Sequence, residues 1–274
     1  MTVPSDTSAV LGRPTAVPRV VLITGAARRI GCELALGFAR RGWDVAVHYG
    51  KSKPEADEVV AEIVALGRRA VALQADLTVE AQVVRLVPDC TAALGRPVCI
   101  VNNASQFDED TAQSVGYEHL LSHMAANVGA PLVLARMLYE ATPEAARSDE
   151  AQRAVVINVL DQKLYNMNPD YLSYTLSKAA LQTATVALAQ ALAPKLRVVG
   201  LAPGLTLRSA DQTPEGFADA HRLTPLGRAS RPEDIVGAAL YLAEAAGVTG
   251  TTLVVDGGQH LVPSPRDVMF LTGV

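Results

Sequence analysis

A tyrosine and a lysine four residues apart, Tyr174 and Lys178, are the pair of side chains best suited to proton transfer in this sequence. Apolar residues continue from Ala179 to Leu192 with helical spacing, and residues i and i+4 share one face of a helix. We therefore expect the Tyr174 hydroxyl and the Lys178 ammonium to meet. A neighbouring cation lowers the pKa of a tyrosine from its ordinary value of about 10. The pattern predicts a general acid at Tyr174, although such a pair in isolation is more typical of a helix surface.

The chain around this pair alternates between short apolar runs and longer helical patterns. The runs predict strands at 20–23, 45–49, 70–73, 98–101, 155–159, 196–201 and 252–255. This alternation predicts right-handed βαβ units and an α/β fold: a single Rossmann-type domain with a doubly wound parallel sheet of about seven strands and helices on both faces. Ligands of such sheets bind beyond the carboxyl ends of the strands. Six residues at or just beyond these ends therefore predict one shared site: Gly25, His48, Asp76, Asn102, Asp161 and Pro203.

The segment boundaries also follow from these patterns. Helices are expected over about 79–94 and, with a kink at Pro131, over about 116–145. Ser230 is the expected cap of a helix that runs through Leu242. We expect residues 1–18 to form a flexible arm, residues 19–262 to form the domain with a substrate loop at 205–230, and residues 263–274 to form a tail.

Composition limits the class of protein. The chain has 274 residues, of which 49% are hydrophobic and 19% charged, with a net charge of −4. This predicts a compact enzyme-like protein with a substantial core and no nucleic-acid partner. The three cysteines, Cys32, Cys90 and Cys99, are expected to be buried free thiols, with no disulfide and no metal site. Because we find neither an apolar stretch of about 18 residues nor a signal peptide, we expect no membrane association and a cytoplasmic protein.

The turn after the first predicted strand, T-G-A-A-R-R-I-G at 24–31, predicts a dinucleotide phosphate site. Gly25 and Gly31 permit a tight turn and a close backbone approach, and the N-terminus of the following helix attracts phosphate. The middle position departs from the standard G-x-G-x-x-G pattern because it carries Arg29.

The end of the second predicted strand indicates which dinucleotide would bind. An NAD-selective site usually has a carboxylate there, bonded to the ribose 2′-hydroxyl. Here the sequence is H-Y-G-K-S at 48–52, with no carboxylate before Glu55. Arg28, Lys51 and Ser52 instead suit a 2′-phosphate, which favours NADP(H) over NAD(H).

Four motifs resemble those of the short-chain dehydrogenase/reductase family and occur in the family's order: T-G-x-x-x-x-I-G at 24–31, N-N-A at 102–104, Y-x-x-x-K at 174–178 and P-G at 203–204. The resemblance extends from about residue 20 to residue 260. It implies that Tyr174 donates a proton, that Lys178 binds the nicotinamide ribose and lowers the tyrosine pKa, and that Asn127 completes a proton relay. It also implies cofactor contacts at Gly25, Ile30, Asp76, Leu77, Asn103, Ala104, Pro203 and Gly204.

One position departs from the family pattern. The family normally has a serine thirteen residues before the tyrosine, and Asp161 occupies that place here. An ionised carboxylate would repel the lone pairs of a ketone oxygen. A carboxyl group with a raised pKa would instead suit protonation of a ring nitrogen while hydride reaches the adjacent carbon. The departure therefore predicts reduction of a C=N bond.

With this aspartate the chain resembles the pteridine reductase, or dihydropterin reductase, branch of the family. T-G-A-A-R-R-I-G at 24–31, V-N-N-A-S-Q-F at 101–107 and the H-Y pair at 48–49 are similar to that branch. The resemblance implies that Arg29 contacts cofactor and pterin, that Ser105 reaches both, that Phe107 stacks on the pterin, and that His48 and Tyr49 belong to the NADPH site.

Two other functions remain open for a chain with these motifs. One is a reductase of the same family that acts on another carbonyl or imine, such as a ketone or a 3-oxoacyl group. The other is a catalytically silent NADP-binding regulator, against which the intact Tyr174–Lys178 pair argues. Because the family commonly forms dimers and tetramers, we also expect a homo-oligomer, with the apolar C-terminal tail packed on another subunit.

Overall fold

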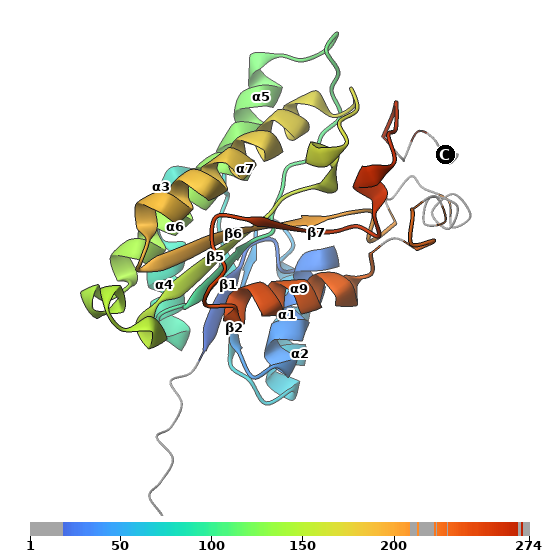
Figure 1. Ribbon diagram of the computed structural model, residues 1–274. Helices are drawn as coiled ribbons and strands as arrows, with labels where there is room; N and C mark the ends of the chain where they lie inside the picture. The colour runs from blue at the N-terminus through green and yellow to red at the C-terminus, as the bar shows by residue number, and fades with distance from the viewer. Residues whose placement is uncertain are drawn as a thin grey trace, which may run out of the picture.

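The computed structural model describes residues 19–208, 213, 222, 224–228, 230–267 and 270. In this part of the chain, seven parallel strands form one sheet in the order β3-β2-β1-β4-β5-β6-β7, with helices on both faces (Figure 1). The strands are β1 (Val20–Ile23), β2 (Asp44–Tyr49), β3 (Ala70–Gln74), β4 (Cys99–Asn102), β5 (Ala154–Val159), β6 (Leu196–Pro203) and β7 (Thr252–Val255). The predicted doubly wound parallel sheet is confirmed. The expected arm at 1–18 and most of the expected loop at 205–230 lie outside the described residues.

The sheet separates two hydrophobic cores. Successive residues of β1 point to opposite faces, so that Ile23 packs in one core and Leu22 in the other. The first core lies under α1 (Arg29–Arg40), α2 (Lys53–Ala65) and α9 (Pro232–Glu244). The second lies mainly under α4 (Leu86–Leu94), α6 (Ala130–Ala141) and α7 (Leu172–Leu192). A strand covered on both faces buries every side chain, which explains why the central strands are uninterrupted apolar runs.

The order of the strands reverses between β1 and β4, which are neighbours in the sheet. From β1 the chain proceeds outward through β2 to β3, and it then returns to the other side of β1 at β4. Such a reversal opens a crevice at the carboxyl ends of the strands. The residues expected to bind ligand follow these ends.

The helix expected over 79–94 is two helices, α3 (Glu80–Val83) and α4, so this prediction is wrong. Pro88 lies in the first turn of α4. A proline has no N–H to offer the carbonyl four residues earlier, here that of Val84, and its ring crowds that carbonyl. The break at Val84 and Arg85 follows from this residue.

The helix expected over 116–145 is also divided. It consists of α5 (Tyr117–Met124), a π-helical turn η1 (Ala125–Gly129) and α6, which ends at Ala141. The irregularity lies in the turn before Pro131, which itself belongs to the first turn of α6. The early end has a similar cause, because Thr142 precedes Pro143 and is extended, with ψ of 125°.

Short 3-10 turns connect the remaining elements: η2 (Glu144–Arg147), η3 (Glu150–Gln152), η4 (Gln162–Tyr165) and η5 (Gln259–Leu261). Ser230 does not cap α9 as expected. The N-cap residue is Arg231, whose backbone N–H donates to Asp234 at 2.9 Å, and the Ser230 hydroxyl lies 2.8 Å from the hydroxyl of Thr206.

The three cysteines are free thiols, with Cys90 and Cys99 buried and Cys32 half-buried. Burial raises the pKa of both Cys90 and Cys99 to about 12, so neither thiol ionises at neutral pH. None of the described helices combines the length and apolar character needed to cross a bilayer.

Candidate active site

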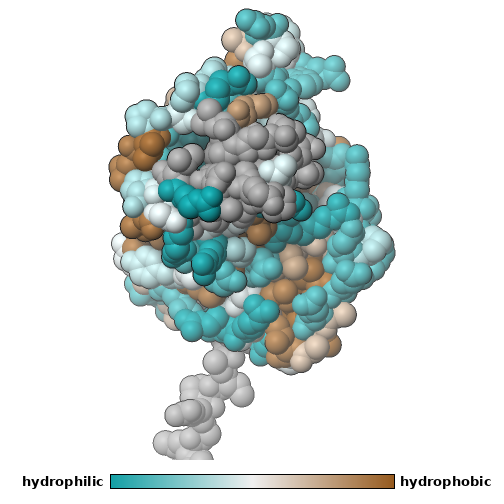
Figure 2. All heavy atoms as spheres, turned by 90° about the vertical axis from the view of Figure 1, so that its right-hand side faces the viewer, coloured by the Kyte–Doolittle hydropathy of each residue, from teal (hydrophilic) through white to brown (hydrophobic). Residues whose placement is uncertain are grey.

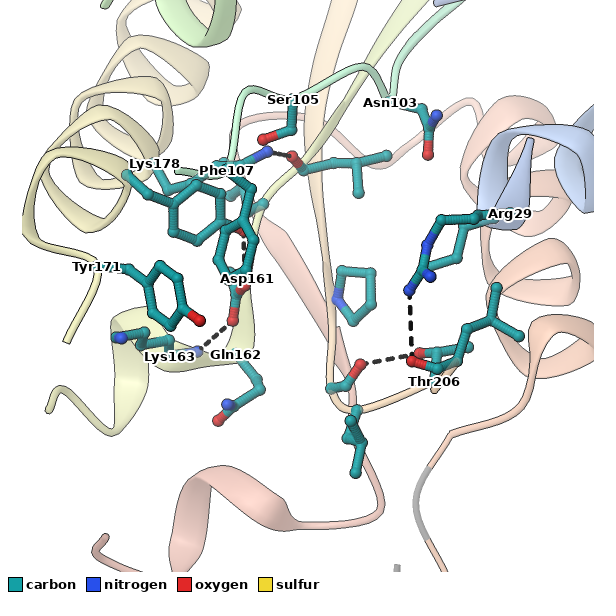
Figure 3. Close-up of a pocket in the computed structure, with 18 of the residues that line it drawn as sticks. Arg29, Asn103, Ser105, Phe107, Asp161, Gln162, Lys163, Tyr171, Lys178 and Thr206 are labelled. Carbon is teal, nitrogen blue, oxygen red and sulfur yellow. Dashed lines mark hydrogen bonds between the residues drawn. The ribbon is translucent and has the colours of Figure 1, made fainter. Parts of the chain in front are cut away.

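A cavity of about 870 Å³ lies at the carboxyl ends of the strands. Figure 3 shows Arg29 on one wall, with Phe107 and Tyr171 on the opposite wall. Seen from the side of the molecule that carries η5, the described surface is mostly hydrophilic, with apolar residues in separate patches (Figure 2). Thirteen of the predicted site residues line the cavity: Gly25, Arg28, Arg29, Ile30, Asn103, Ala104, Ser105, Phe107, Asp161, Tyr174, Lys178, Pro203 and Gly204.

Two acidic groups that line the cavity, the Tyr174 hydroxyl and the Asp161 carboxyl group, are joined by a short hydrogen bond. The Tyr174 hydroxyl donates to Asp161 Oδ2 at 2.7 Å, and the Lys163 backbone N–H donates to Asp161 Oδ1 at 2.8 Å. Burial raises the pKa of Asp161. Burial and the Asp161 charge together raise the pKa of Tyr174 well above 10. The pair therefore retains a proton at a pH where an exposed aspartate would have lost it.

The expected contact between the Tyr174 hydroxyl and Lys178 is not made, and the predicted fall in the tyrosine pKa is wrong. The Lys178 ammonium donates to the carbonyl of Val159 at 2.7 Å and lies 5.7 Å from the centre of the Tyr174 ring. Burial lowers the pKa of Lys178 to about 8. Lys178 is thus a cation near the Tyr174 ring, while the Tyr174 hydroxyl is directed to the Asp161 carboxyl group.

Local structure explains how Asp161 reaches this position. The residue follows β5 by two positions and is the N-cap of η4, where its carboxylate accepts the N–H two residues later. Aspartate is among the preferred residues at such a cap. Oδ1 of Asp161 caps the turn, so Oδ2 can accept the hydrogen bond from Tyr174, which lies in the first turn of α7.

An aromatic cluster forms the wall beside this pair. The ring of Phe107 stacks on that of Tyr171, with ring centroids 4.3 Å apart, and lies nearly perpendicular to that of Tyr174, with centroids 4.6 Å apart. Tyr171 immediately precedes α7 in a left-handed conformation, with φ of 53°. The sequence did not indicate that Tyr171 lines the cavity, because an aromatic residue before a helix carries no specific signal. Phe107 keeps 45% of its surface exposed and is available to a flat ligand.

The predicted phosphate turn is tightly built around two glycines. Gly25 has φ of +62°, and a Cβ on Gly31 would lie 2.0 Å from the Gly25 carbonyl oxygen and 2.6 Å from the Asn103 amide nitrogen. That amide donates to the carbonyls of Thr24 and Gly25 at 2.9 and 3.2 Å. Only glycine fits at position 31, because any side chain would collide with the turn.

His48 supports this turn from behind and does not line the cavity. Its Nδ1 accepts the Gly25 N–H at 3.0 Å, so the ring proton belongs on Nε2, which lies 3.1 Å from the carbonyl of Ala75. Burial lowers the pKa of His48 to about 4. The His48 side chain positions the turn, and Tyr49 is likewise buried in the core. That these two residues belong to the NADPH site stays a prediction.

The buried neutral His48 predicts a pH-dependent stability. An unfolded histidine takes up a proton below about pH 6.5. The folded one does so only near pH 4, so stability falls as pH drops through that window. The limiting loss is about 3 kcal/mol. In thermal melts at pH 7.5 and pH 4.5, His48→Gln should show a smaller fall in Tm than the wild type. Equal falls would contradict this assignment.

The remaining predicted cofactor residues lie outside the cavity: Lys51, Ser52, Asp76 and Leu77. Arg28 forms an ion pair with Glu55, the first carboxylate after β2. Asp76 caps its own turn by accepting the N–H and hydroxyl of Thr78 at 2.9 and 2.7 Å. Binding of a 2′-phosphate by Arg28, Lys51 and Ser52 stays a prediction.

Asn127 also lies outside the cavity, on the π-helical turn η1. Its amide oxygen accepts the Gln106 N–H at 2.8 Å, and its amide nitrogen donates to the Gln106 carbonyl and the Ser177 hydroxyl at 3.0 and 2.9 Å. The side chain fastens the 103–107 loop to α7. The role of Asn127 in a proton relay stays a prediction.

Arg29 lies at the junction of the phosphate turn and the segment after β6. It has φ of 54° and donates to the carbonyls of Arg208 and Leu207 at 3.0 and 3.4 Å. Pro203 and Gly204 line the same side of the cavity. Arg29 can therefore reach both a phosphate bound at the turn and a ligand in the cavity.

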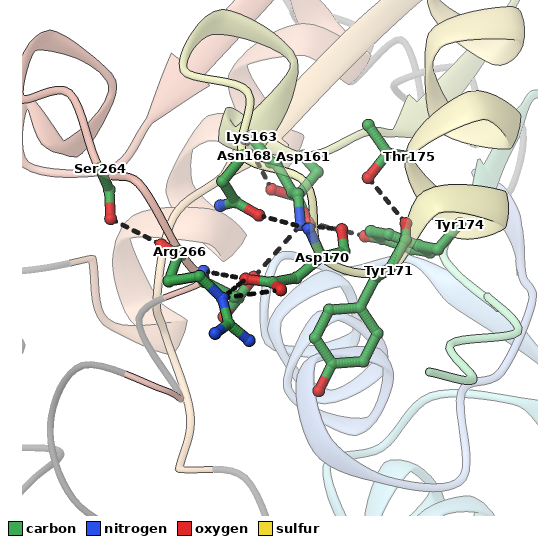
Figure 4. A network of polar contacts seen from close by, with 10 residues as sticks. Asp161, Lys163, Asn168, Asp170, Tyr171, Tyr174, Thr175, Ser264 and Arg266 are labelled. Atoms are coloured by element: carbon green, nitrogen blue, oxygen red, sulfur yellow. Dashed lines mark hydrogen bonds and ion pairs between the residues drawn. The ribbon is translucent and has the colours of Figure 1, made fainter. Parts of the chain in front are cut away.

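Residues near the C-terminus form part of the cavity, which the sequence did not indicate. Asp267 lines it, and Arg266 is ion-paired to Asp170 in the loop before α7 (Figure 4). The ring of Phe270 lies 6.1 Å from that of Tyr171. These described tail residues pack on their own chain, and contact between the tail and another subunit stays a prediction.

The fold and this site define a short-chain dehydrogenase/reductase, and the chain belongs to that family. Residues 25–260 match the family model described as enoyl-(acyl carrier protein) reductase. The protein is accordingly an oxidoreductase.

Several proteins are similar over nearly the whole chain. FolM alternative dihydrofolate reductase 1 from Brucella canis, solved with NADP, has 38% identity and a TM-score of 0.85, with 92% of this chain and 98% of that one covered. The protein of the same description from Brucella suis, also with NADP, has 36% identity and a TM-score of 0.81, with 91% and 98% covered. A 3-oxoacyl-[acyl-carrier-protein] reductase from Synechocystis is 31% identical, with 88% of this chain and 96% of that protein covered.

Proposed function

We propose that this protein is an NADPH-dependent reductase that transfers hydride to a C=N bond of a dihydropterin, giving a tetrahydropterin. The observation that supports this most directly is the 2.7 Å hydrogen bond from Tyr174 to Asp161. A proton held between two acidic groups suits a basic ring nitrogen better than a ketone oxygen, which an ionised carboxylate would repel. The two Brucella proteins described as alternative dihydrofolate reductases support the same substrate class.

The cavity fits a nicotinamide dinucleotide. At the end where we expect the phosphates, the turn around Gly31 is so close-packed that a Cβ would not fit. This turn lies at the N-terminus of the twelve-residue helix α1. The other end of the cavity is lined by Gly204, which has no room for a side chain because a Cβ would lie 2.5 Å from the Asp256 side chain. The NADP-bound Brucella structures favour NADP(H) as the cofactor. When bound, NADPH supplies the hydride.

The residues of the chain supply the proton and control its position. The substrate C=N carbon would gain hydride, and its nitrogen would gain the Tyr174 hydroxyl proton, which the extra proton that burial retains on the Asp161 carboxyl group would replace. CH–NH forms in this way, and the pair changes from neutral to a single negative charge. Lys178, a buried ammonium with a pKa of about 8, stabilises that charge. The pair then regains a proton from water. Phe107 supplies a flat apolar surface on which the heterocycle stacks.

Turnover of NADPH tests this proposal. Oxidation of NADPH is followed at 340 nm with dihydrobiopterin and dihydrofolate, beside a panel of ketones and 3-oxoacyl thioesters. We expect reduction of at least one pterin and little reduction of the ketones. Reduction of ketones or 3-oxoacyl groups without pterins would overturn the proposal in favour of the activity described for the Synechocystis relative. NADPH binding with no turnover of any substrate would indicate a regulator.

We further propose that the protein acts in the cytoplasm as a homo-oligomer, either a dimer or a tetramer. The support is the habit of the family that the motifs indicate. Sedimentation or light scattering of the purified protein would measure the oligomeric state, and a monomer at micromolar concentration would contradict it.

A further inference from the structure

The C-terminal segment, residues 262–267, is fastened across the loop that connects Asp161 to α7 (Figure 4). Arg266 Nε donates to both carboxylate oxygens of Asp170 at 2.9 Å, and the Asp267 backbone N–H donates to Asp170 at 2.6 Å. Asn166 bonds to the backbone of Val262 and accepts the N–H of Ser264. These hydrogen bonds hold the segment beside the cavity, which Asp267 lines.

A buried lysine connects this segment to the acidic pair. The Lys163 side chain is only 4% exposed, and its ammonium donates to the carbonyl of Asp170 at 2.6 Å and lies 3.5 Å from Asp267 Oδ2. The backbone N–H of the same lysine donates to Asp161. Lys163 thus contacts Asp161 through its backbone N–H and Asp267 through its ammonium. This places the Asp267 carboxyl group in the same bonded network as Asp161.

The Asp267 side chain faces the cavity and not only its anchoring partners. It lines the cavity with Phe107 and Gln162, and 18% of its side-chain surface remains exposed. Its charge raises the pKa of both Asp161 and Tyr174, which shows that it lies within electrostatic reach of the pair. A carboxylate in such a place accepts hydrogen bonds from N–H and O–H groups and repels anions.

We propose that Asp267 is a specificity-determining residue of this active site: it accepts hydrogen bonds from N–H or O–H groups of the substrate and disfavours substrates with an anionic substituent. The inference deepens the proposed function and rests on it. Among dihydropterins, it favours one with an uncharged, hydroxylated side chain, such as dihydrobiopterin, over dihydrofolate with its glutamate carboxylates. The aromatic wall and Asp161 accept the common ring of both, and Asp267 distinguishes the substituents.

The test compares Asp267→Asn with wild type by the ratio of kcat/KM for dihydrobiopterin to kcat/KM for dihydrofolate. The wild type should prefer dihydrobiopterin. The variant should lower this ratio about tenfold, equivalent to about 1.4 kcal/mol. The change should come mainly from KM, with kcat altered less than about threefold and NADPH affinity unchanged. Asparagine keeps the shape of the side chain and the backbone bond to Asp170 but removes the ion-pair partner of the buried Lys163, so Tm should fall, and the kinetics are measured well below the Tm of both proteins.

Two further variants separate a specific role from a general one. Asp267→Glu, which keeps the charge, should restore most of the preference. Asp108→Asn removes a carboxylate that also lines the cavity but accepts from Gln106 at 2.6 Å, and it should change the ratio less than about twofold.

Each outcome decides the matter. Equal effects of Asp267→Asn and Asp108→Asn would overturn the inference, because any charge at the cavity would then suffice. An unchanged ratio in Asp267→Asn, or a wild-type preference for dihydrofolate, would overturn it while the proposed function stands. Failure of the wild type to reduce either pterin would overturn the proposed function and this inference with it.

Discussion

Replacing Asp161 by serine should lower kcat for dihydropterin reduction by about a hundred- to a thousandfold, within the range that a positioned general acid contributes. The NADPH dissociation constant should stay within about twofold, because the Asp161 side chain, within the described part of the chain, bonds to Tyr174 and to the Lys163 backbone. Serine keeps a hydroxyl near Tyr174 but cannot hold the extra proton that burial retains on the carboxyl group. Steady-state kinetics with NADPH and dihydrobiopterin measure the first effect, and titration of NADPH fluorescence measures the second.

Asp161→Asn is the matched control, because it preserves size and removes only the ionisable group. It should be nearly as inactive as the serine variant and as well folded as the wild type. If both variants lost NADPH affinity in proportion to kcat, Asp161 would have a structural role as the cap of η4 and no role in proton transfer.

The pH profile gives an independent check on the same pair. The raised pKa of Asp161 means that the active, protonated form exists below that pKa and is lost as pH rises through it. Above about pH 8 the Lys178 ammonium is lost as well. We therefore expect kcat/KM to fall on the alkaline side, and the part of this fall that belongs to Asp161 to disappear in Asp161→Asn.

The sheet could be predicted from the sequence because its central strands are buried on both faces. Continuous runs such as 20–23 and 155–159 have no other common interpretation when helical patterns separate them. The observed strands begin and end within two residues of the expected positions, as β5 (Ala154–Val159) illustrates. The helices were less predictable. Their apolar periodicity continues across Pro88 and the π-helical turn before Pro131, so periodicity alone did not reveal the breaks.

The candidate site was predictable only where chemistry follows from neighbouring positions. Tyr174 and Asp161 follow from a strand, a turn and a helix that are consecutive in the chain. The direction of the tyrosine pKa did not follow, because i,i+4 spacing places Lys178 near the ring but does not determine where its ammonium points. Asp267 was not predictable at all. It reaches the cavity through bonds to Asp170, a residue 97 positions away, and the sequence contains no local sign of that contact.

Replacing Gly31 by alanine should abolish detectable NADPH binding, with at least a hundredfold loss of affinity, and should lower the stability of the protein. The new Cβ would lie 2.0 Å from the Gly25 carbonyl oxygen, a backbone atom that cannot move aside without opening the turn. Opening the turn would also disturb the bonds that Gly25 makes to Asn103 and His48. Thermal melts and titration of NADPH fluorescence measure the two effects.

Gly237→Ala is the matched control. Gly237 lies inside α9, and nothing lies within 4 Å of the place a Cβ would occupy. Alanine in a helix interior is favoured over glycine by roughly 0.5–1 kcal/mol, so this variant should melt slightly higher and bind NADPH normally. If Gly31→Ala bound NADPH as the wild type does, the turn at 24–31 would not hold the dinucleotide, and the cofactor would have to enter the cavity from another side. The opposite signs expected for the same chemical change arise from the geometry of the turn, since both variants add one methyl group to a helix.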